Sequence, residues 1–138
     1  MPDTPTYTVR AYAKGVELAP RKVSIVASLV RGRKVADALV ILDHTQRRAA
    51  LPVAKAIASA QANATNNHGL DAKSLVITKL SVTTGPRLKR FKPHMRGMAL
   101  PFQKKSSHIL VEVTGTEKVK KKPAAKKAVP AEKVEEKK

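Results

Sequence analysis

A cationic segment in the second half of the chain carries the residues best suited to binding chemistry. Residues 85–108 contain seven lysines and arginines, three prolines and no acidic residue. The cations are Arg87, Lys89, Arg90, Lys92, Arg96, Lys104 and Lys105. Cations at this density can neutralise phosphates, while Phe91, Phe102 and the methionines between them can pack on sugars or bases. We therefore predict that the segment binds nucleic acid; the alternative is a solvated, disordered loop.

The whole chain is strongly basic. Its 138 residues include 28 Lys and Arg against 10 Asp and Glu, which gives a formal net charge of +18 and a pI near 10.6. A charge of one sign and this size causes self-repulsion unless a polyanion neutralises it. The composition thus indicates nucleic acid as the first candidate partner.

A second group of cations surrounds the first predicted helix and its exit. Its members are Lys14, Arg21, Lys22, Arg31, Arg33 and Lys34. Helical spacing places several of them away from the apolar stripe, so they form either a second binding surface or a solvated face. Near the end of the third predicted helix, Asn63, Asn66 and Asn67 either bond to nucleotides or terminate the helix.

Patterns of catalytic or metal-binding residues are missing from the sequence. The four histidines have no metal-ligand spacing, and the first 114 residues contain six acids. The six glycines form no phosphate-binding loop, and no serine lies in a GxSxG motif. We expect no enzyme activity, no metal, no cofactor and no small-molecule substrate.

The chain also lacks cysteine, a signal-peptide pattern and any apolar run of about 20 residues that could span a membrane. These features predict a soluble protein of the cytoplasm without membrane contact. The length predicts one domain over residues 1–114. The Lys/Ala/Pro-rich stretch 115–138 has too few large apolar residues to offset the entropy of ordering, which predicts a flexible basic tail.

Three helices are predicted after a first strand at 6–12. The first helix spans 18–30 with Pro20 in its first turn, and the second spans about 34–44. The third begins near Gln46 with Thr45 as its cap and carries an apolar stripe of small side chains. Pro52 then falls inside the helix, unless the helix bends there or begins later.

Two strands with a period of two follow Gly69. One face is expected to carry Val76, Thr78, Leu80 and Val82, and the returning strand presents Ile109, Val111 and Val113. An antiparallel pairing makes residues 85–106 a hairpin of about 30 Å reach, well beyond a body of about 13 Å radius of gyration. The predicted fold is α+β, with three helices on a small antiparallel sheet and a long protruding hairpin.

Four motifs follow one another in compatible order between about Val9 and Val113. They are APRKV with the following VRG, ANATNN, GPRLKR at Gly85–Arg90, and SSHI at Ser106–Ile109. In these motifs the chain resembles the large-subunit ribosomal protein twenty-two family of bacterial type. The resemblance implies a structural constituent of the large subunit that binds 23S-type rRNA, supports assembly, and contacts neighbouring ribosomal proteins.

The resemblance also assigns residues to these roles. It implies RNA contact for Arg21, Lys22, Arg31, Arg33, Lys34, Arg87, Lys89, Arg90, Lys92 and Arg96. Lys14, Lys104, Lys105 and His108 complete the predicted RNA-binding set. The hairpin tip that lines the nascent-peptide exit tunnel would comprise His94, Met95, Arg96, Gly97, Met98, Ala99 and Leu100. Family members often have a basic RAKGRA-like turn there, so this tip carries fewer charges than theirs.

A second function fits the composition. The high pI and the Lys/Ala/Pro tail are also typical of a free nucleic-acid-binding protein of nucleoid or RNA-chaperone type, which would bind DNA and RNA with little preference for shape.

Overall fold

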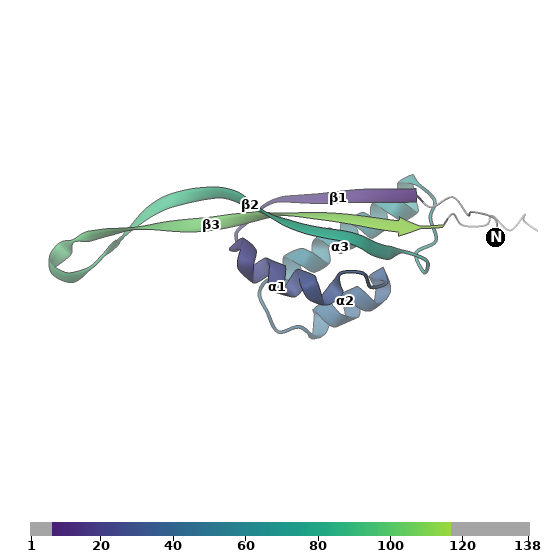
Figure 1. Cartoon of the computed structure of the whole chain (residues 1–138), viewed down its shortest axis with the longest axis horizontal. Helices are drawn as coiled ribbons and strands as arrows, with labels where there is room; N and C mark the ends of the chain where they lie inside the picture. Colours follow the sequence, from purple (N-terminus) through teal and green to yellow (C-terminus); the bar gives the residue numbers. More distant parts are fainter. Residues whose placement is uncertain (1–6, 117–138) are drawn as a thin grey trace, which may run out of the picture.

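The structure is a computed structural model that describes residues 7–116. Its elements in chain order are β1 (Tyr7–Val16), α1 (Pro20–Val30), α2 (Val35–His44), α3 (Ala50–Asn67), β2 (Val76–Pro93), the single 3₁₀ turn η1 (Met95–Gly97) and β3 (Ala99–Gly115). The strands form one antiparallel sheet in the order β1-β3-β2. The helices cover one face of this sheet (Figure 1), which confirms the predicted α+β architecture.

The core lies between the sheet and the helices. Alternate residues of the central strand β3, namely Ile109, Val111 and Val113, are fully buried, as the period of two predicted. From the helix side, Val26 of α1 and Ile57 of α3 are also fully buried. Small residues such as Ala56, Ala60 and Ala64 line the buried side of α3, so this helix can pack closely against the strands.

The predicted inner face of β2 is wrong in its first half. Ile77 is fully buried, whereas Val76 is only half-buried and Thr78 is exposed. The register shifts between Ile77 and Lys79, so Thr78 is an extra residue that brings both Ile77 and Leu80 to the core. Ile77 also exchanges backbone hydrogen bonds of 3.0 and 3.1 Å with the turn between α1 and α2, and these bonds fix its orientation.

The predicted start of α3 is also wrong. The helix begins at Ala50, and Thr45 is the C-cap of α2, where its hydroxyl donates a 2.7 Å hydrogen bond to the carbonyl of Ile41. Pro52 therefore lies in the first turn, where a missing backbone N–H breaks no helical hydrogen bond. This later start removes the conflict that Pro52 posed to the sequence-based prediction.

The protruding hairpin is confirmed. Beyond the end of β1, β2 and β3 continue as a two-stranded ladder from the pair Arg87–Lys105 to the pair Pro93–Ala99, and this ladder extends away from the helices (Figure 1). At the tip, Arg96 and Gly97 have φ values of 53° and 75°. Glycine tolerates this left-handed backbone at no cost, which suits Gly97 to the tight turn at the tip.

The body extends at least to Thr116, which exchanges hydrogen bonds with Asp71 and Ser74. The predicted flexible tail otherwise falls on residues 117–138, outside the described residues. The assignment of residues 1–114 to a single domain stays a prediction. None of the helices within residues 7–116 has the length and apolar character needed to cross a membrane.

One buried hydroxyl yields a stability prediction. Ser107 is fully buried, and its Oγ has no hydrogen-bond partner among the described residues. Because an unsatisfied buried hydroxyl is costly, Ser107→Ala should raise the free energy of unfolding by about 1 kcal/mol. Ser106→Ala is the matched control of opposite sign, since the Ser106 hydroxyl donates a 2.6 Å hydrogen bond to the carbonyl of Pro86. Denaturant unfolding of both variants checks this; equal changes would contradict it.

Candidate nucleic-acid interface

The register gives the hairpin two chemically different faces. The outer face continues the side of the sheet that lies away from the core. It carries the pairs Leu88–Lys104, Phe102–Arg90 and Leu100–Lys92, each of one apolar and one cationic residue. The ammonium of Lys92 lies 5.1 Å from the centroid of the Phe102 ring. Cationic and apolar groups at neighbouring positions are the combination that contacts phosphates and bases together.

The inner face changes character along its length. Next to the body it carries the cationic pair Arg87–Lys105, followed by Lys89 opposite Gln103. Towards the tip it carries only the pairs Phe91–Pro101 and Pro93–Ala99. The inner face is therefore cationic near the body and apolar near the tip.

Every residue from Pro86 to Lys105 is exposed. Phe91 retains 70% of its surface and Met95 retains 75%, so the apolar side chains of the hairpin are not packed by the rest of the described chain. Isolated two-stranded hairpins are marginal in water, and exposed apolar surface of this extent indicates contact with a partner. The hairpin is thus built to be covered by another molecule.

Three contacts hold the root of the hairpin, the region where it leaves the body. The ammonium of Lys104 lies 2.8 Å from the Glu17 carboxylate, the Ser106 hydroxyl bonds to Pro86, and the Gly15 N–H donates a 3.0 Å hydrogen bond to Nδ1 of His108. Lys104 and His108, both predicted RNA ligands, therefore also have structural roles. Sequence reasoning missed Glu17, although it is the only acid among residues 4–36.

The Glu17–Lys104 pair yields a prediction on pH. The hydrogen bond from Lys104 and its positive charge lower the pKa of Glu17 below its ordinary value of 4.5. Because the folded pKa is the lower one, the pair stabilises the root above pH 4.5, and the contribution is lost as pH falls through the folded value. Lys104→Gln should move the pKa of Glu17 back towards 4.5, as measured by NMR titration of its carboxyl carbon. An unchanged titration would contradict the pairing.

The second predicted group of cations is divided in the structure. Arg21 and Lys22 lie in the first turn of α1, whereas Arg31, Arg33 and Lys34 follow its last turn. An 11-residue helix separates these ends by roughly 16 Å. Lys14 belongs to neither end, because it lies on strand β1. All six are exposed, so the structure provides several cationic sites in place of one cluster.

Two of these arginines also bond to the backbone. The guanidinium of Arg31 donates a 2.9 Å hydrogen bond to the carbonyl of Leu80, and that of Arg33 donates a 3.0 Å hydrogen bond to the carbonyl of Leu29. These bonds fix the position of the charges, and both residues remain exposed to a ligand.

Other cations were missed by sequence reasoning. Arg47 and Arg48, which precede α3, join Lys22 and the exposed Ile25 around one surface hollow. Arg10 and Lys79 flank Glu112 on the sheet. Their spacing in the sequence carries no sign of this proximity, because the turn between α2 and α3 and the strand register create it.

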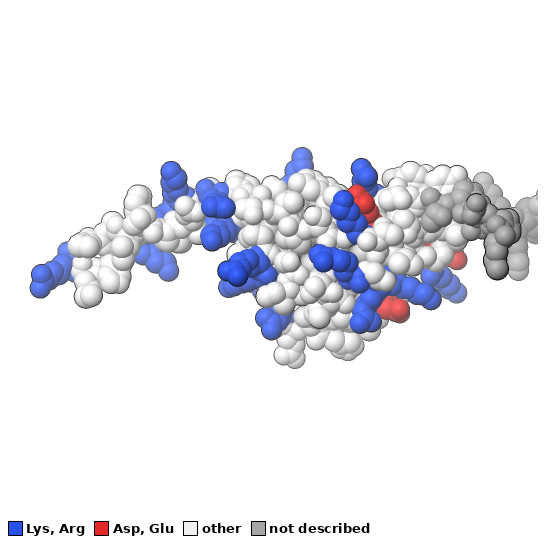
Figure 2. Space-filling view, viewed as in Figure 1, with Lys and Arg blue, Asp and Glu red and all other residues white. Residues whose placement is uncertain are grey.

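Few acidic residues balance the cations of the described chain. Within residues 7–116, the two ion pairs are Arg10–Glu112 at 3.1 Å and Lys104–Glu17 at 2.8 Å. Lys and Arg side chains are distributed along the hairpin and over the body in Figure 2, where few acidic side chains are visible. The charge of this surface is therefore available to a polyanion.

Two of the three asparagines near the end of α3 lie at positions that fit a structural role. The Asn63 amide donates a 3.4 Å hydrogen bond to the carbonyl of Arg10 in β1. Asn67 is the last helical residue, and Gly69 follows with a φ of 61°. These positions fit the helix-terminating interpretation, and contact with nucleotides stays untested.

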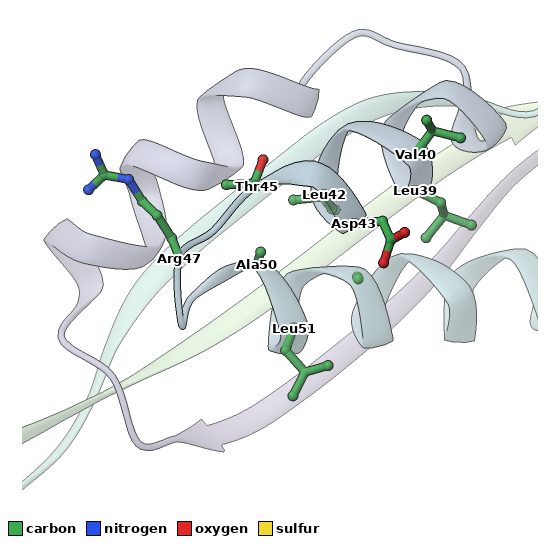
Figure 3. A pocket seen from close by; sticks show the side chains of 9 residues that line it. Leu39, Val40, Leu42, Asp43, Thr45, Arg47, Ala50 and Leu51 are labelled. Atoms are coloured by element: carbon green, nitrogen blue, oxygen red, sulfur yellow. The ribbon is translucent and has the colours of Figure 1, made fainter.

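The described residues offer no catalytic arrangement. Among them, no group of three or more His, Asp or Glu could hold a metal ion. The hollow between α2 and α3 in Figure 3 is lined mostly by apolar side chains, including Leu39, Val40 and Leu51, with Asp43 as the single carboxylate. Without a paired acid, base or nucleophile, this surface is suited to packing and not to chemistry.

Comparisons with known proteins identify relatives of this chain. The family model described as ribosomal protein L22p/L17e matches residues 11–114. A protein of Oceanobacillus iheyensis named large ribosomal subunit protein uL22 is 50% identical over 105 residues, which cover 76% of this chain and 93% of that protein. A protein of the same name from Metamycoplasma arthritidis is 43% identical over 136 residues, which cover 88% of this chain and 65% of that protein. The one in Pediococcus pentosaceus is 48% identical over 107 residues, covering 78% and 91%.

Proposed function

This chain belongs to the ribosomal protein L22p/L17e family, and from that premise we propose that it binds 23S-type rRNA, supports large-subunit assembly and lines the peptide exit tunnel with its hairpin tip. The family is one of structural proteins and not of enzymes, so the chain has a structural role in the large ribosomal subunit. Its surroundings there are rRNA and other ribosomal proteins.

The observation that carries the proposal is the exposed hairpin. It contains seven cations and no acid, extends beyond the helices, and leaves its aromatic side chains uncovered. A folded rRNA supplies both the negative charge and the stacking surface that such an element lacks. The proposed RNA ligands are the fourteen residues predicted from the sequence. Seven lie on the body, namely Lys14, Arg21, Lys22, Arg31, Arg33, Lys34 and His108, and the other seven lie on the hairpin.

The tip is the proposed contact with the nascent peptide. Residues 94–100 contain Arg96 as their only Lys or Arg, and Met95 and Met98 are 75% and 65% exposed. Together with the apolar end of the inner face, these side chains would present a mostly uncharged surface to a passing peptide. Flexible methionines adapt to varied side chains, which suits a contact that cannot select one sequence.

Neighbouring ribosomal proteins are the proposed partners of the apolar side of the body. Val40 of α2 and Leu51 of α3 are 58% and 65% exposed beside the hollow in Figure 3. Apolar residues in this position favour protein contact over contact with phosphates.

Chemical footprinting of the rRNA in large subunits with and without this chain tests the proposal. We expect protection in several separated rRNA segments, including segments that meet around the hairpin, and retention of the chain on subunits washed in moderate salt. A free nucleic-acid-binding protein would wash off and would protect RNA with little preference for shape. That result would favour the rival function and overturn this one.

A further inference from the structure

One face of the sheet is left uncovered by the helices (Figure 1). This open face carries Arg10, Tyr12 and Lys14 of β1, Lys79 of β2, and His108 and Leu110 of β3. All six are exposed or half-buried. The residues between them on β1 and β3, such as Ala11 and Ile109, are buried against the helices.

Tyr12 is the centre of this face. Its ring is 49% exposed and pairs across the strands with Leu110. The centroid of the His108 ring lies 5.9 Å from that of Tyr12, at an interplanar angle of 38°. The hydrogen bond from the Gly15 N–H holds the imidazole in place through Nδ1, which leaves Nε2–H as the donor of the neutral ring. Tyr12, Leu110 and His108 together form an apolar, aromatic surface, and the Nε2–H of His108 adds a hydrogen-bond donor at its edge.

Cations lie on both sides of that aromatic surface. Lys14 and Arg10 are each two residues from Tyr12 along β1, or about 6.6 Å, and the ammonium of Lys14 reaches to 5.5 Å from the Tyr12 ring centroid. Lys79 of β2 is the register partner of Glu112 of β3, so it lies on this face from the side opposite Arg10. Glu112 is the one acid on the described part of this face, its side chain is 13% exposed, and Arg10 pairs with it at 3.1 Å. The open face is therefore cationic at both ends and aromatic in the middle.

We propose that the open face holds an unpaired nucleobase of the large-subunit rRNA, stacked on Tyr12, with its flanking phosphates at Lys14 and at Arg10 and Lys79. An aromatic ring between cations is the arrangement by which sheets bind single-stranded nucleotides, and stacking needs a base that is free of its duplex. Tyr12 is 49% exposed, so a base can approach its ring from outside, and the Lys14 ammonium near the ring can contact the base's phosphate. The inference rests on the proposed rRNA binding and adds a contact on the body to those of the hairpin.

The position of the face supports RNA over a protein partner. Even-numbered residues of β3 lie on one side, so the open face runs from His108 into the outer hairpin face of Lys104, Phe102 and Leu100. One polyanion can follow this continuous surface of cations and apolar groups. The apolar part at Tyr12 and Leu110 is narrow and has cations on both sides, whereas the core of a protein interface is depleted of charge.

Base-specific chemical probing of large subunits assembled with Tyr12 variants tests the proposal. In subunits with Tyr12→Leu, one unpaired rRNA base should become several-fold more reactive, and the affinity of the chain for large-subunit rRNA should fall about tenfold. Tyr12→Phe keeps the ring, so the base should stay protected. Tyr7→Leu is the matched control, because Tyr7 is a 42% exposed tyrosine of the same strand whose register partner is Gly115.

The chain itself provides a second readout. It has two tyrosines and no tryptophan, so Tyr7→Phe leaves Tyr12 as the only strong intrinsic fluorophore, and stacking of a base should quench it when large-subunit rRNA is added. No quenching, or equal base reactivity with Tyr12→Leu and the parent chain while the hairpin footprint persists, would overturn the base site alone. Absence of any footprint with the parent chain would instead overturn the proposed function. Thermal unfolding of Tyr12→Leu separates loss of the site from loss of the fold.

Discussion

Replacing Lys89 and Arg90 together with glutamate should weaken binding of large-subunit rRNA on the order of 100-fold at physiological salt. Lys89 lies on the inner face of the hairpin and Arg90 on the outer face. One of the two glutamates therefore faces phosphate from whichever side the RNA approaches. The hairpin contains no native acidic residue, so these glutamates would be its only negative charges. Filter binding gives the affinity, and sedimentation profiles of cells carrying the variant should show depleted large subunits.

The neutral double variant, with both residues replaced by glutamine, measures how much the phosphate contacts of Lys89 and Arg90 contribute to the affinity. It should lower the slope of log K against log salt by about two, one for each lost phosphate contact. The control for the charge-reversed hairpin variant replaces Lys55 and Lys73 with glutamate, which changes the net charge by the same amount. Both are exposed lysines, on α3 and before β2. Truncation after Thr116 is the second control and should weaken assembly less than the hairpin variant. Equal subunit profiles for the charge-reversed hairpin variant, the Lys55 and Lys73 control and the truncated chain would contradict a specific role of the hairpin.

Sequence periodicity was sufficient for the parts of the fold in which one face is buried along a regular element. Ile109, Val111 and Val113 alternate because β3 is paired on both sides and covered on one face. Val23, Val26 and Val30 follow helical spacing because α1 packs on the same sheet. In both cases a local pattern and the tertiary burial agree, which is the condition under which such patterns are reliable.

The two errors have different physical origins, one in a long-range contact and one in a local hydrogen bond that could form in either direction. The bulge at Thr78 depends on the backbone contact of Ile77 with the turn between α1 and α2, more than 40 residues away in sequence. Thr45 was predicted to cap the next helix, but its hydroxyl bonds backward to Ile41. A β-branched polar residue between two helices can serve either one, and only the tertiary arrangement decides.

The candidate interface was predictable in composition and not in geometry. The cations of the hairpin are visible in the sequence, but their division into an outer face of mixed pairs and an inner face with an apolar end depends on the register. That register includes the shift between Thr84 and Arg87, which no residue pattern indicates. The ion pair of Glu17 and the open face around Tyr12 likewise join residues that are about 90 positions apart.

The second large effect is expected at this register shift, where Gly85→Val should destabilise the fold by about 2 kcal/mol. A Cβ atom at Gly85 would lie 2.6 Å from the Ser106 hydroxyl oxygen and 3.2 Å from the Ser106 carbonyl carbon. The hydroxyl can rotate away only by giving up its hydrogen bond to Pro86, and the carbonyl carbon is part of the backbone of the central strand, which pairs with β1 from the next residue, Ser107. The substitution should therefore separate β2 from β3 at the root and disrupt the hydrogen bond from Ser106 to Pro86.

This variant tests whether the direction of the hairpin matters independently of its charge, because Gly85→Val alters no cation. We expect denaturant unfolding at lower concentration, faster hydrogen exchange of amides on both sides of the root, and reduced incorporation into large subunits. Thr83→Val is the matched control, since Thr83 is exposed on the same strand two residues earlier. Normal incorporation of a Gly85→Val protein with a loosened root would show that rRNA alone can direct the hairpin, and the root contacts would then contribute to stability only.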